Sequence, residues 1–245
     1  MRNRKVRFCS LVLATVMLLG LLAGCSSDSG SGSGGGSSSG GDKDSIVIAT
    51  ANETPSLSPT EHNAVAGSYM NLLTYNTLFR SGMDLEPEPD LVDTYENVDD
   101  STWQFKIKEG VKFHNGETMT ADDVVASIQW AQTFAEVNLY NSDIVSISKI
   151  DDLTVEIKTD GPDAMLLSNL THHGNAIVPK KLIDEGHDFN SDPIGSGPYK
   201  LVEWKRGDSL TFEAFEDYFD GAPKIKNMTW KIIQMCIRDR SAPTT

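Results

Sequence analysis

The 245-residue sequence predicts a mixed α/β fold, with α+β features, in which hairpins contribute to a mixed sheet. Three observations support this prediction. Several short segments are β-branched or alternate between apolar and polar residues, which is typical of strands. Other segments repeat apolar residues every three or four positions, which is typical of helices. Neighbouring strand segments are separated by tight turns, so hairpins and helices are intermixed along the chain.

The folded part is predicted to begin near Ser45. Residues 45–50 form a compact β-branched run, which predicts a buried strand, and two prolines within 51–59 predict a loop. Apolar side chains in residues 64–80 recur at close to helical spacing, so we expect a helix there. Residues 85–100 are acidic and rich in loop-forming residues, and we expect a connector.

The middle of the chain predicts paired strands. Residues 103–108 alternate between apolar and polar side chains, which indicates a half-buried strand. A turn at 109–110 precedes a returning segment that starts at 111–113. Residues 144–150 and 153–159 repeat the alternation on either side of two aspartates, which predicts a hairpin.

The last third of the folded part predicts further helices and strands. One helix is placed by a proline near its start and a glycine after its end. In order, we expect a short helix, a short strand, a helix and three strands at residues 163–170, 175–178, 179–186, 198–204, 209–215 and 226–233.

The segment around His114 brings a histidine close to three carboxylates in sequence, Glu117, Asp122 and Asp123. Thr120 can act as a helix N-cap, and Asp123, three residues later, can complete a capping box. Both aspartates also suit the positive end of the helix dipole. A histidine and a glutamate three residues apart on a turn do not orient two metal ligands as a helix would. We therefore expect structural roles, with a metal or acid–base site as the alternative.

Residues 1–24 have the pattern of a secretory signal peptide. Four cations precede an apolar run of seventeen residues. A membrane span needs about 20 residues, so a retained anchor helix is only the alternative. The tetrapeptide Leu22-Ala23-Gly24-Cys25 resembles the bacterial lipobox, which implies cleavage before Cys25 and lipidation of its sulfur.

Residues 25–44 then form a tether, because 15 of the 19 residues from 26 to 44 are Ser or Gly. Such a composition behaves as a flexible coil. We expect a protein outside the cytoplasm, held on the bacterial cell membrane by lipid on Cys25.

Charge and cysteine content argue against a nucleic-acid-binding protein and against a fold held by disulfides. Cleavage before Cys25 leaves 17 Lys and Arg against 35 Asp and Glu, a formal charge of −18. This opposes nucleic-acid binding. Of the three cysteines, Cys9 leaves with the signal peptide and Cys25 is lipidated, so Cys236 has no partner for a disulfide framework. The sequence shows no nucleophile elbow or zinc helix and implies no cofactor, so we do not expect an enzyme.

Four blocks of the chain have a recognisable pattern: "KEGVKFHNG" with "TADDV" (108–124), "PIGSGPYKLVEW" (193–204), "YFDGAPKIKNMTWKII" (218–233) and "SLSP" (56–59). Together they resemble family 5 extracellular solute-binding proteins, the peptide and nickel receptors of ABC importers. They cover residues 45 to about 233. The resemblance implies a periplasmic-binding-protein-like fold of the peptide-receptor type, of which this chain holds mainly the first lobe.

The end of the chain departs from that family. Residues 234–245 match none of its blocks and lack a strand pattern, so we expect a disordered tail. Family members are about twice as long and continue into a second lobe. We expect a truncated gene or a wrongly joined end, with residues 45–233 forming the first lobe.

The resemblance places candidate ligand contacts in loops that face the space between the lobes. They are Asn52, Glu53, Thr54, His62, Thr171, His172, His173 and Asn175, with Tyr140 a weaker candidate beside Asn141. Glu53 suits the amino end of a peptide. The histidines suit hydrogen bonds to a peptide or a metal chelate, although neighbouring His side chains point apart on a strand and need a loop to act together. The alternative for each is an ordinary loop residue.

The resemblance implies a substrate-binding lipoprotein that captures peptides or a related small solute and delivers it to the permease subunits of an ABC importer. A surface sensor or adhesin that reuses the fold is the alternative from another class. A nickel or metal-chelate receptor and a hydrolase that uses His114 or His172 are further alternatives.

Overall fold

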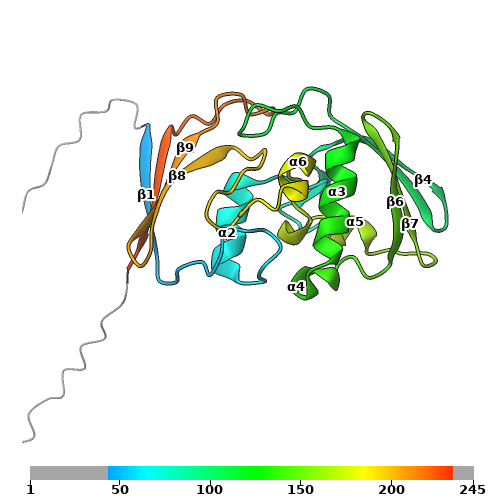
Figure 1. Ribbon diagram of the computed structural model, residues 1–245, viewed down its shortest axis with the longest axis horizontal. Helices are drawn as coiled ribbons and strands as arrows, with labels where there is room; N and C mark the ends of the chain where they lie inside the picture. The colour runs from blue at the N-terminus through cyan, green and yellow to red at the C-terminus, as the bar shows by residue number, and fades with distance from the viewer. Residues whose placement is uncertain (1–43, 234–245) are drawn as a thin grey trace, which may run out of the picture. The chain divides into compact units, whose positions relative to one another are not determined.

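Two four-stranded sheets stand on either side of a group of helices in residues 44–233, the part of the chain that the computed structural model describes (Figure 1). These residues belong to one compact unit. The predicted signal peptide at 1–24, Cys25, the tether up to residue 43 and the predicted tail at 234–245 lie outside the described residues. Within 44–233, no helix is long and apolar enough to cross a membrane. The predicted mixed α/β class is confirmed.

The first sheet joins the two ends of the described chain. Its strands are β1 (Ser45–Thr50), β8 (Tyr199–Lys205), β9 (Ser209–Ala214) and β10 (Asn227–Ile232). Their order is β1-β10-β9-β8. β1 runs parallel to β10, whereas the other pairs are antiparallel, so this sheet is mixed (Figure 1). All four strands were expected from the sequence.

The prediction that β1 is buried is wrong. Val47 is 71% exposed and Ile46 is 38% exposed. Among the described strands, β1 pairs only with β10, so it forms an edge of the sheet. A β-branched run marks the strand conformation but does not reveal how many neighbours the strand has.

The second sheet is antiparallel throughout. It contains β4 (Val92–Asp99), β5 (Thr102–Ile107), β6 (Ile144–Asp151) and β7 (Thr154–Thr159) in the order β4-β5-β7-β6. The β6–β7 hairpin and β5 confirm the predictions for these segments. The segment that was expected to return as a strand after residue 110 forms only one isolated bridge, between Lys112 and Thr118.

The prediction of a connector at 85–100 is also wrong. This segment contains β4 and β3 (Pro87–Pro89), and β3 pairs with β2 (Phe79–Ser81). No apolar alternation marks β4 in the sequence, because all its side chains after Val92 are exposed. Its backbone pairing with β5 holds it in the sheet.

The helices lie between the sheets. They are α2 (Val65–Thr74), α3 (Ala121–Gln132), α4 (Ala135–Asn138), α5 (Leu166–Asn169), the 3-10 helix η2 (His173–Asn175) and α6 (Lys180–Asp184). The capping box at Thr120 and Asp123 is confirmed, because Asp123 Oδ2 accepts a hydrogen bond from the Thr120 backbone N–H at 2.8 Å. α4 was not expected from the sequence.

Two further boundaries differ from prediction. The helix expected at 64–80 ends at Thr74, whose carbonyl accepts a hydrogen bond from the backbone N–H of Gly197 at 2.9 Å. A Cβ on Gly197 would lie 2.4 Å from the Thr74 carbonyl carbon, so only glycine permits this approach. Residues 175–178 are not a strand, because Asn175 ends η2 and the segment makes no ladder.

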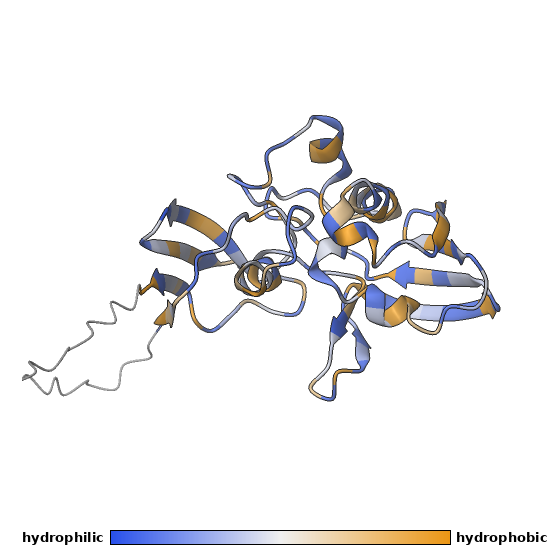
Figure 2. Cartoon of the chain, turned by 90° about the horizontal axis from the view of Figure 1, so that it is seen from below, coloured by the Kyte–Doolittle hydropathy of each residue, from blue (hydrophilic) through white to orange (hydrophobic). Residues whose placement is uncertain are grey.

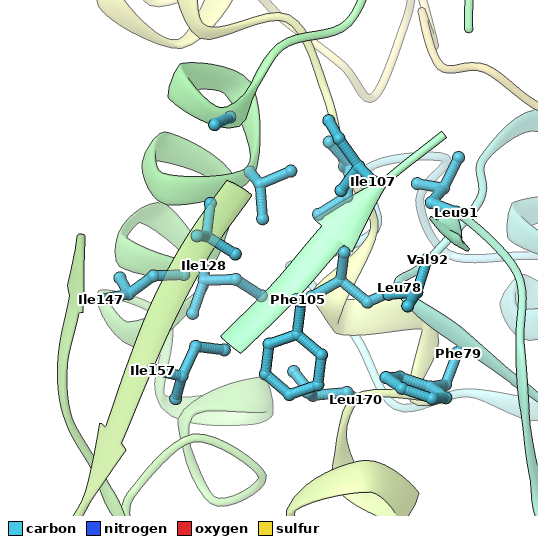
Figure 3. Packing of buried hydrophobic residues seen from close by; sticks show 14 of the residues in the cluster. Leu78, Phe79, Leu91, Val92, Phe105, Ile107, Ile128, Ile147, Ile157 and Leu170 are labelled. Atoms are coloured by element: carbon cyan, nitrogen blue, oxygen red, sulfur yellow. The ribbon is translucent and has the colours of Figure 1, made fainter. Parts of the chain in front are cut away.

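The largest apolar cluster lies between the second sheet and α3. Figure 3 shows Phe105, Ile147 and Ile157 of the sheet against Ile128 of α3, with Leu170 alongside. A second cluster, with Met70 of α2 and Phe212 of β9, packs under the first sheet. Figure 2 shows apolar and polar residues alternating along strands of both sheets, as half-buried strands require.

Candidate functional site

Four aromatic rings predicted as ligand contacts lie in one row, which we call the histidine cluster: Tyr140, His172, His173 and His62. The ring centroids of Tyr140 and His172 are 3.7 Å apart and nearly parallel. The His172 and His173 rings are 4.2 Å apart, and the His173 and His62 rings are 5.4 Å apart. Residues from three separate segments of the chain therefore form one continuous ring surface.

The 3-10 helix η2 brings the two neighbouring histidines together. His172 is the N-cap of η2, and its Nδ1 accepts a hydrogen bond from the Gly174 backbone N–H at 3.1 Å. A Cβ on Gly174 would lie 2.4 Å from Val137 of α4, so this turn packs closely on α4. On a strand the two side chains would point apart, whereas this turn holds both rings in the row.

Hydrogen bonds fix His173 in the middle of the row. Its Nδ1 lies 3.2 Å from Ser68 Oγ on α2, and its Nε2 lies 3.1 Å from the His62 carbonyl oxygen. His62 is only 6% exposed, and its Nδ1 accepts from the Ala64 backbone N–H at 3.2 Å. Within the described residues, His62 Nε2 has no hydrogen-bond partner.

The three imidazoles of the cluster are uncharged at neutral pH. Burial lowers the pKa of His172 to about 3, and the nearby His173 and His62 rings oppose its protonation further. Burial also lowers the pKa of His62 and of His173. A neutral imidazole has one donor and one acceptor nitrogen. The cluster therefore offers hydrogen bonds and flat ring faces without a fixed charge.

The other predicted residues of this segment support the backbone. Asn175 is 1% exposed; its Oδ1 accepts from Asn141 Nδ2 at 2.6 Å, and its Nδ2 donates to the Asn169 carbonyl at 2.9 Å. Thr171 Oγ1 donates to the Ser168 carbonyl at 2.8 Å. These bonds hold the turn that carries the two histidines.

Three predicted residues follow β1 and form a second group. Glu53 Oε1 accepts hydrogen bonds from Trp204 Nε1 at 2.9 Å and from the Gly207 backbone N–H at 3.0 Å. Thr54 is buried and its hydroxyl donates to the Ser56 carbonyl, while Asn52 is exposed. Glu53 thus ties this loop to the β8–β9 turn, and its contact with a peptide amino end stays a prediction.

His114 and its neighbouring carboxylates have structural partners. The His114 ring lies 2.9 Å from the Gly197 carbonyl through Nε2 and accepts from the Gly195 backbone N–H through Nδ1 at 3.4 Å. Burial lowers its pKa to about 4. Asp122 pairs with Lys149 at 2.7 Å. Within residues 44–233, no group of three or more His, Cys, Asp or Glu side chains is arranged to hold a metal ion.

Sequence reasoning missed Ser68. It lies on a helix, and its partner His173 is 105 positions away in the chain, so no local pattern marks it. The sequence indicates Asn141 only as the neighbour of Tyr140. Its role depends on Asn175, which is 34 positions away.

Within a mixed α/β fold, uncharged rings from three segments of the chain thus form one surface. Residues 86–241 match the sequence model described as "Bacterial extracellular solute-binding proteins, family 5 Middle". This range is more than half of the chain, and the chain belongs to this family. The family consists of binding proteins, not enzymes.

Relatives have named ligands. The chain is 29% identical over 251 residues to the oligopeptide-binding protein AppA of Bacillus subtilis, an alignment that covers 95% of this chain and 45% of AppA. It is 30% identical over 192 residues to the glutathione-binding protein GsiB of Pectobacterium atrosepticum, covering 76% of this chain and 37% of GsiB. The chain thus spans less than half the length of these curated relatives.

Solved structures confirm the periplasmic-binding-protein-like fold. The structure of AppA in complex with a nonapeptide has a TM-score of 0.69 at 29% identity and covers 77% of this chain and 40% of AppA. The structure of NikZ from Campylobacter jejuni in complex with Ni(L-His) has a TM-score of 0.70 at 27% identity, covering 78% of this chain and 39% of NikZ.

Proposed function

We propose that the chain belongs to the substrate-binding component of an ABC importer, which captures peptides or a related small solute outside the membrane and delivers it to the permease. The observation that carries this proposal is the family match over residues 86–241, together with the similarity to an oligopeptide-binding protein along 95% of the chain. Residues 45–233 then form one lobe of a receptor whose two lobes close on the ligand.

The geometry of the histidine cluster suits a peptide. A peptide backbone presents planar amides, each with one donor and one acceptor. Neutral His172 and Tyr140 offer a stacked ring surface and nitrogen or hydroxyl partners of both kinds. Because these rings carry no charge, they do not select the charge of a peptide side chain.

Calorimetric titration of the two-lobed receptor that contains this chain, with a nonapeptide and with glutathione, tests the proposal. We expect saturable binding of the nonapeptide, with the affinity reduced about tenfold in His172→Ala, since roughly 1.4 kcal/mol of contact is lost. His187→Ala is the matched control, because His187 lies outside the cluster and bonds to the Asp192 carbonyl. Absence of binding to a broad peptide set by the two-lobed receptor would contradict the proposal.

A metal-chelate receptor is the second candidate, because His62 Nε2 lacks a partner among the described residues and the fold is similar to that of NikZ. Here the metal is cargo. Titration with nickel and L-histidine distinguishes the two candidates. Tighter binding of this chelate than of any peptide, abolished in His62→Gln, favours the chelate; binding that is unchanged in His62→Gln opposes it.

For localisation, we propose a lipid anchor on Cys25, supported by the lipobox-like Leu22-Ala23-Gly24-Cys25 and by the extracellular family. Expression in a bacterium with radiolabelled palmitate tests this anchor. We expect label on the wild-type chain and none on Cys25→Ser, whereas Cys236→Ser keeps the label. Equal labelling of wild type and Cys25→Ser would exclude lipidation at this residue.

A further inference from the structure

A cavity of about 200 Å³ lies beside the C-terminal half of α2, apart from Tyr140 and Glu53. Asn71, Asn76, Asp90, His173, Pro198 and Tyr218 contribute to its wall. Leu72 and Arg80, which also line it, are exposed and connect it with solvent. The cavity has several times the roughly 30 Å³ that one water occupies in the liquid, so it has room for a small molecule.

Asn71 is the first unusual feature of this wall. Its side chain is 1% exposed, and neither Nδ2 nor Oδ1 has a hydrogen-bond partner among the described residues. Buried polar atoms are nearly always partnered in folded proteins, so each exception needs a reason. Asn71 belongs to the wall of the cavity, which places its unpartnered amide next to the space that a ligand would occupy.

Asp90 is the second feature. It is 8% exposed, and its Oδ2 accepts a hydrogen bond from Asn76 Nδ2 at 2.8 Å. Within residues 44–233, no lysine, arginine or histidine forms an ion pair with it. Arg80, the cation at the rim, is paired with Glu88 at 3.1 Å. Burial raises the pKa of Asp90, and Lys108 and Arg80 only partly oppose this.

The acceptors around the cavity match a primary ammonium group. Such a group has three N–H donors. The Asp90 carboxylate, Asn71 Oδ1 and Tyr218 Oη, which lies 3.4 Å from Asn76 Nδ2, are acceptors on the cavity wall. An oxygen two carbons from the nitrogen would accept the remaining donor, Asn71 Nδ2. A buried carboxylate without an ion pair gains most from a cation that also donates hydrogen bonds.

We propose that this cavity is a binding site for a small primary ammonium compound of the amino-alcohol type, with its ammonium on Asp90 and Tyr218 and both of its polar groups on the Asn71 amide. The site is separate from the proposed peptide contacts, and only His173 borders both.

Calorimetry and thermal unfolding of the 245-residue chain with ethanolamine as the probe test this site. We expect saturable binding and a raised Tm with ethanolamine, with at least tenfold weaker binding of propylammonium and of ethylene glycol, which each lack one of the two polar groups. Asp90→Asn and Asn71→Leu should each weaken ethanolamine binding at least tenfold. Asp100→Asn, the same chemical change in the exposed β4–β5 turn, should leave it unaltered.

Two outcomes would overturn the site: no saturable ethanolamine binding to the wild-type chain, or equal binding by wild type and Asn71→Leu. Asn71→Leu decides the matter if Asp90→Asn does not fold, because it replaces an unpartnered buried amide with an apolar side chain of similar size. Peptide titration of the same variants tests the proposed function separately from this site, since neither residue belongs to the proposed peptide contacts.

Discussion

The second sheet with α3, here called the sheet region (residues 92–107, 121–132 and 144–159), buries apolar side chains. The polar region (residues 51–78, 113–116, 171–178 and 193–198) buries many polar ones. Phe105, Ile128 and Ile157 are each 0% exposed in the sheet region. In the polar region Ser58 and Asn175 are each 1% exposed. One part of the protein is therefore held mainly by packing, and the other depends far more on directed hydrogen bonds.

Unpartnered polar groups, which can bind a ligand, are expected where the interior is polar. Apolar packing is non-directional and gives rigid support. Buried polar groups each need a placed partner, and a group without one has capacity for a ligand. Four buried side-chain atoms lack partners among the described residues. His62 Nε2 and both polar atoms of Asn71 lie in the polar region, whereas Asn141 Oδ1 lies between α4 and β6.

The largest effect is expected from a cavity in the sheet region. Phe105→Ala should lower the free energy of unfolding by about 3–5 kcal/mol, because it removes a fully buried ring that packs on Phe79 at 5.8 Å. Urea unfolding followed by circular dichroism measures this loss. Val98→Ala, on the exposed side of β4, should change stability by about 0.5 kcal/mol or less. A loss below about 1 kcal/mol for Phe105→Ala would contradict an apolar origin of stability.

The next effect is a pH dependence that belongs to the polar region. Burial depresses the pKa of His114 to about 4, below the value of about 6.5 in the unfolded chain. The unfolded chain therefore takes up the proton first. The stability that neutral His114 contributes is fully present above pH 6.5 and is lost as the pH falls toward 4, by about 3 kcal/mol in total.

Urea unfolding at intervals between pH 7 and pH 5 checks this dependence. His114→Gln should flatten the decline relative to wild type over this window, while Phe105→Ala should shift stability equally at every pH. If the free energy of unfolding of His114→Gln falls with pH as steeply as that of wild type, His114 does not cause the decline. The decline would then come from the other histidines with lowered pKa values, His172 above all.

The sequence was informative where structure depends on near neighbours. The capping box at Thr120 and the β6–β7 hairpin follow from residues a few positions apart, and both were predicted. The predictions from the sequence were wrong where a contact between distant parts of the chain determines the local structure. α2 ends at Thr74 because Gly197 meets it, more than a hundred positions away. β4 is exposed along nearly its whole length, so no pattern of burial was available to read.

The candidate site shows the same limit. The histidines and Tyr140 were named from the resemblance to a family, but their stacking was not foreseen. The row depends on His173 meeting the His62 carbonyl, 111 positions away, and on a 3-10 turn at His173–Asn175, where the sequence predicted only a loop before a strand. The sequence does not predict Asn71 or Asp90 as binding residues. The cavity that they line forms only when α2 and Tyr218 come together.

The smallest effect is expected from the capping box of α3, a hydrogen-bonded group inside the sheet region. Asp123→Ala should lower the free energy of unfolding by about 1 kcal/mol, since Asp123 accepts from the backbone N–H groups of Thr120 and Lys180, each at 2.8 Å. Asp122→Ala removes the same charge from the same helix end but breaks only an exposed pair with Lys149, so about 0.5 kcal/mol or less is expected. Paired urea titrations of the two variants measure the difference. If Asp122→Ala costs as much as Asp123→Ala, charge near the helix dipole and not the capping box stabilises α3, and the sheet region is less dependent on directed hydrogen bonds than the structure indicates.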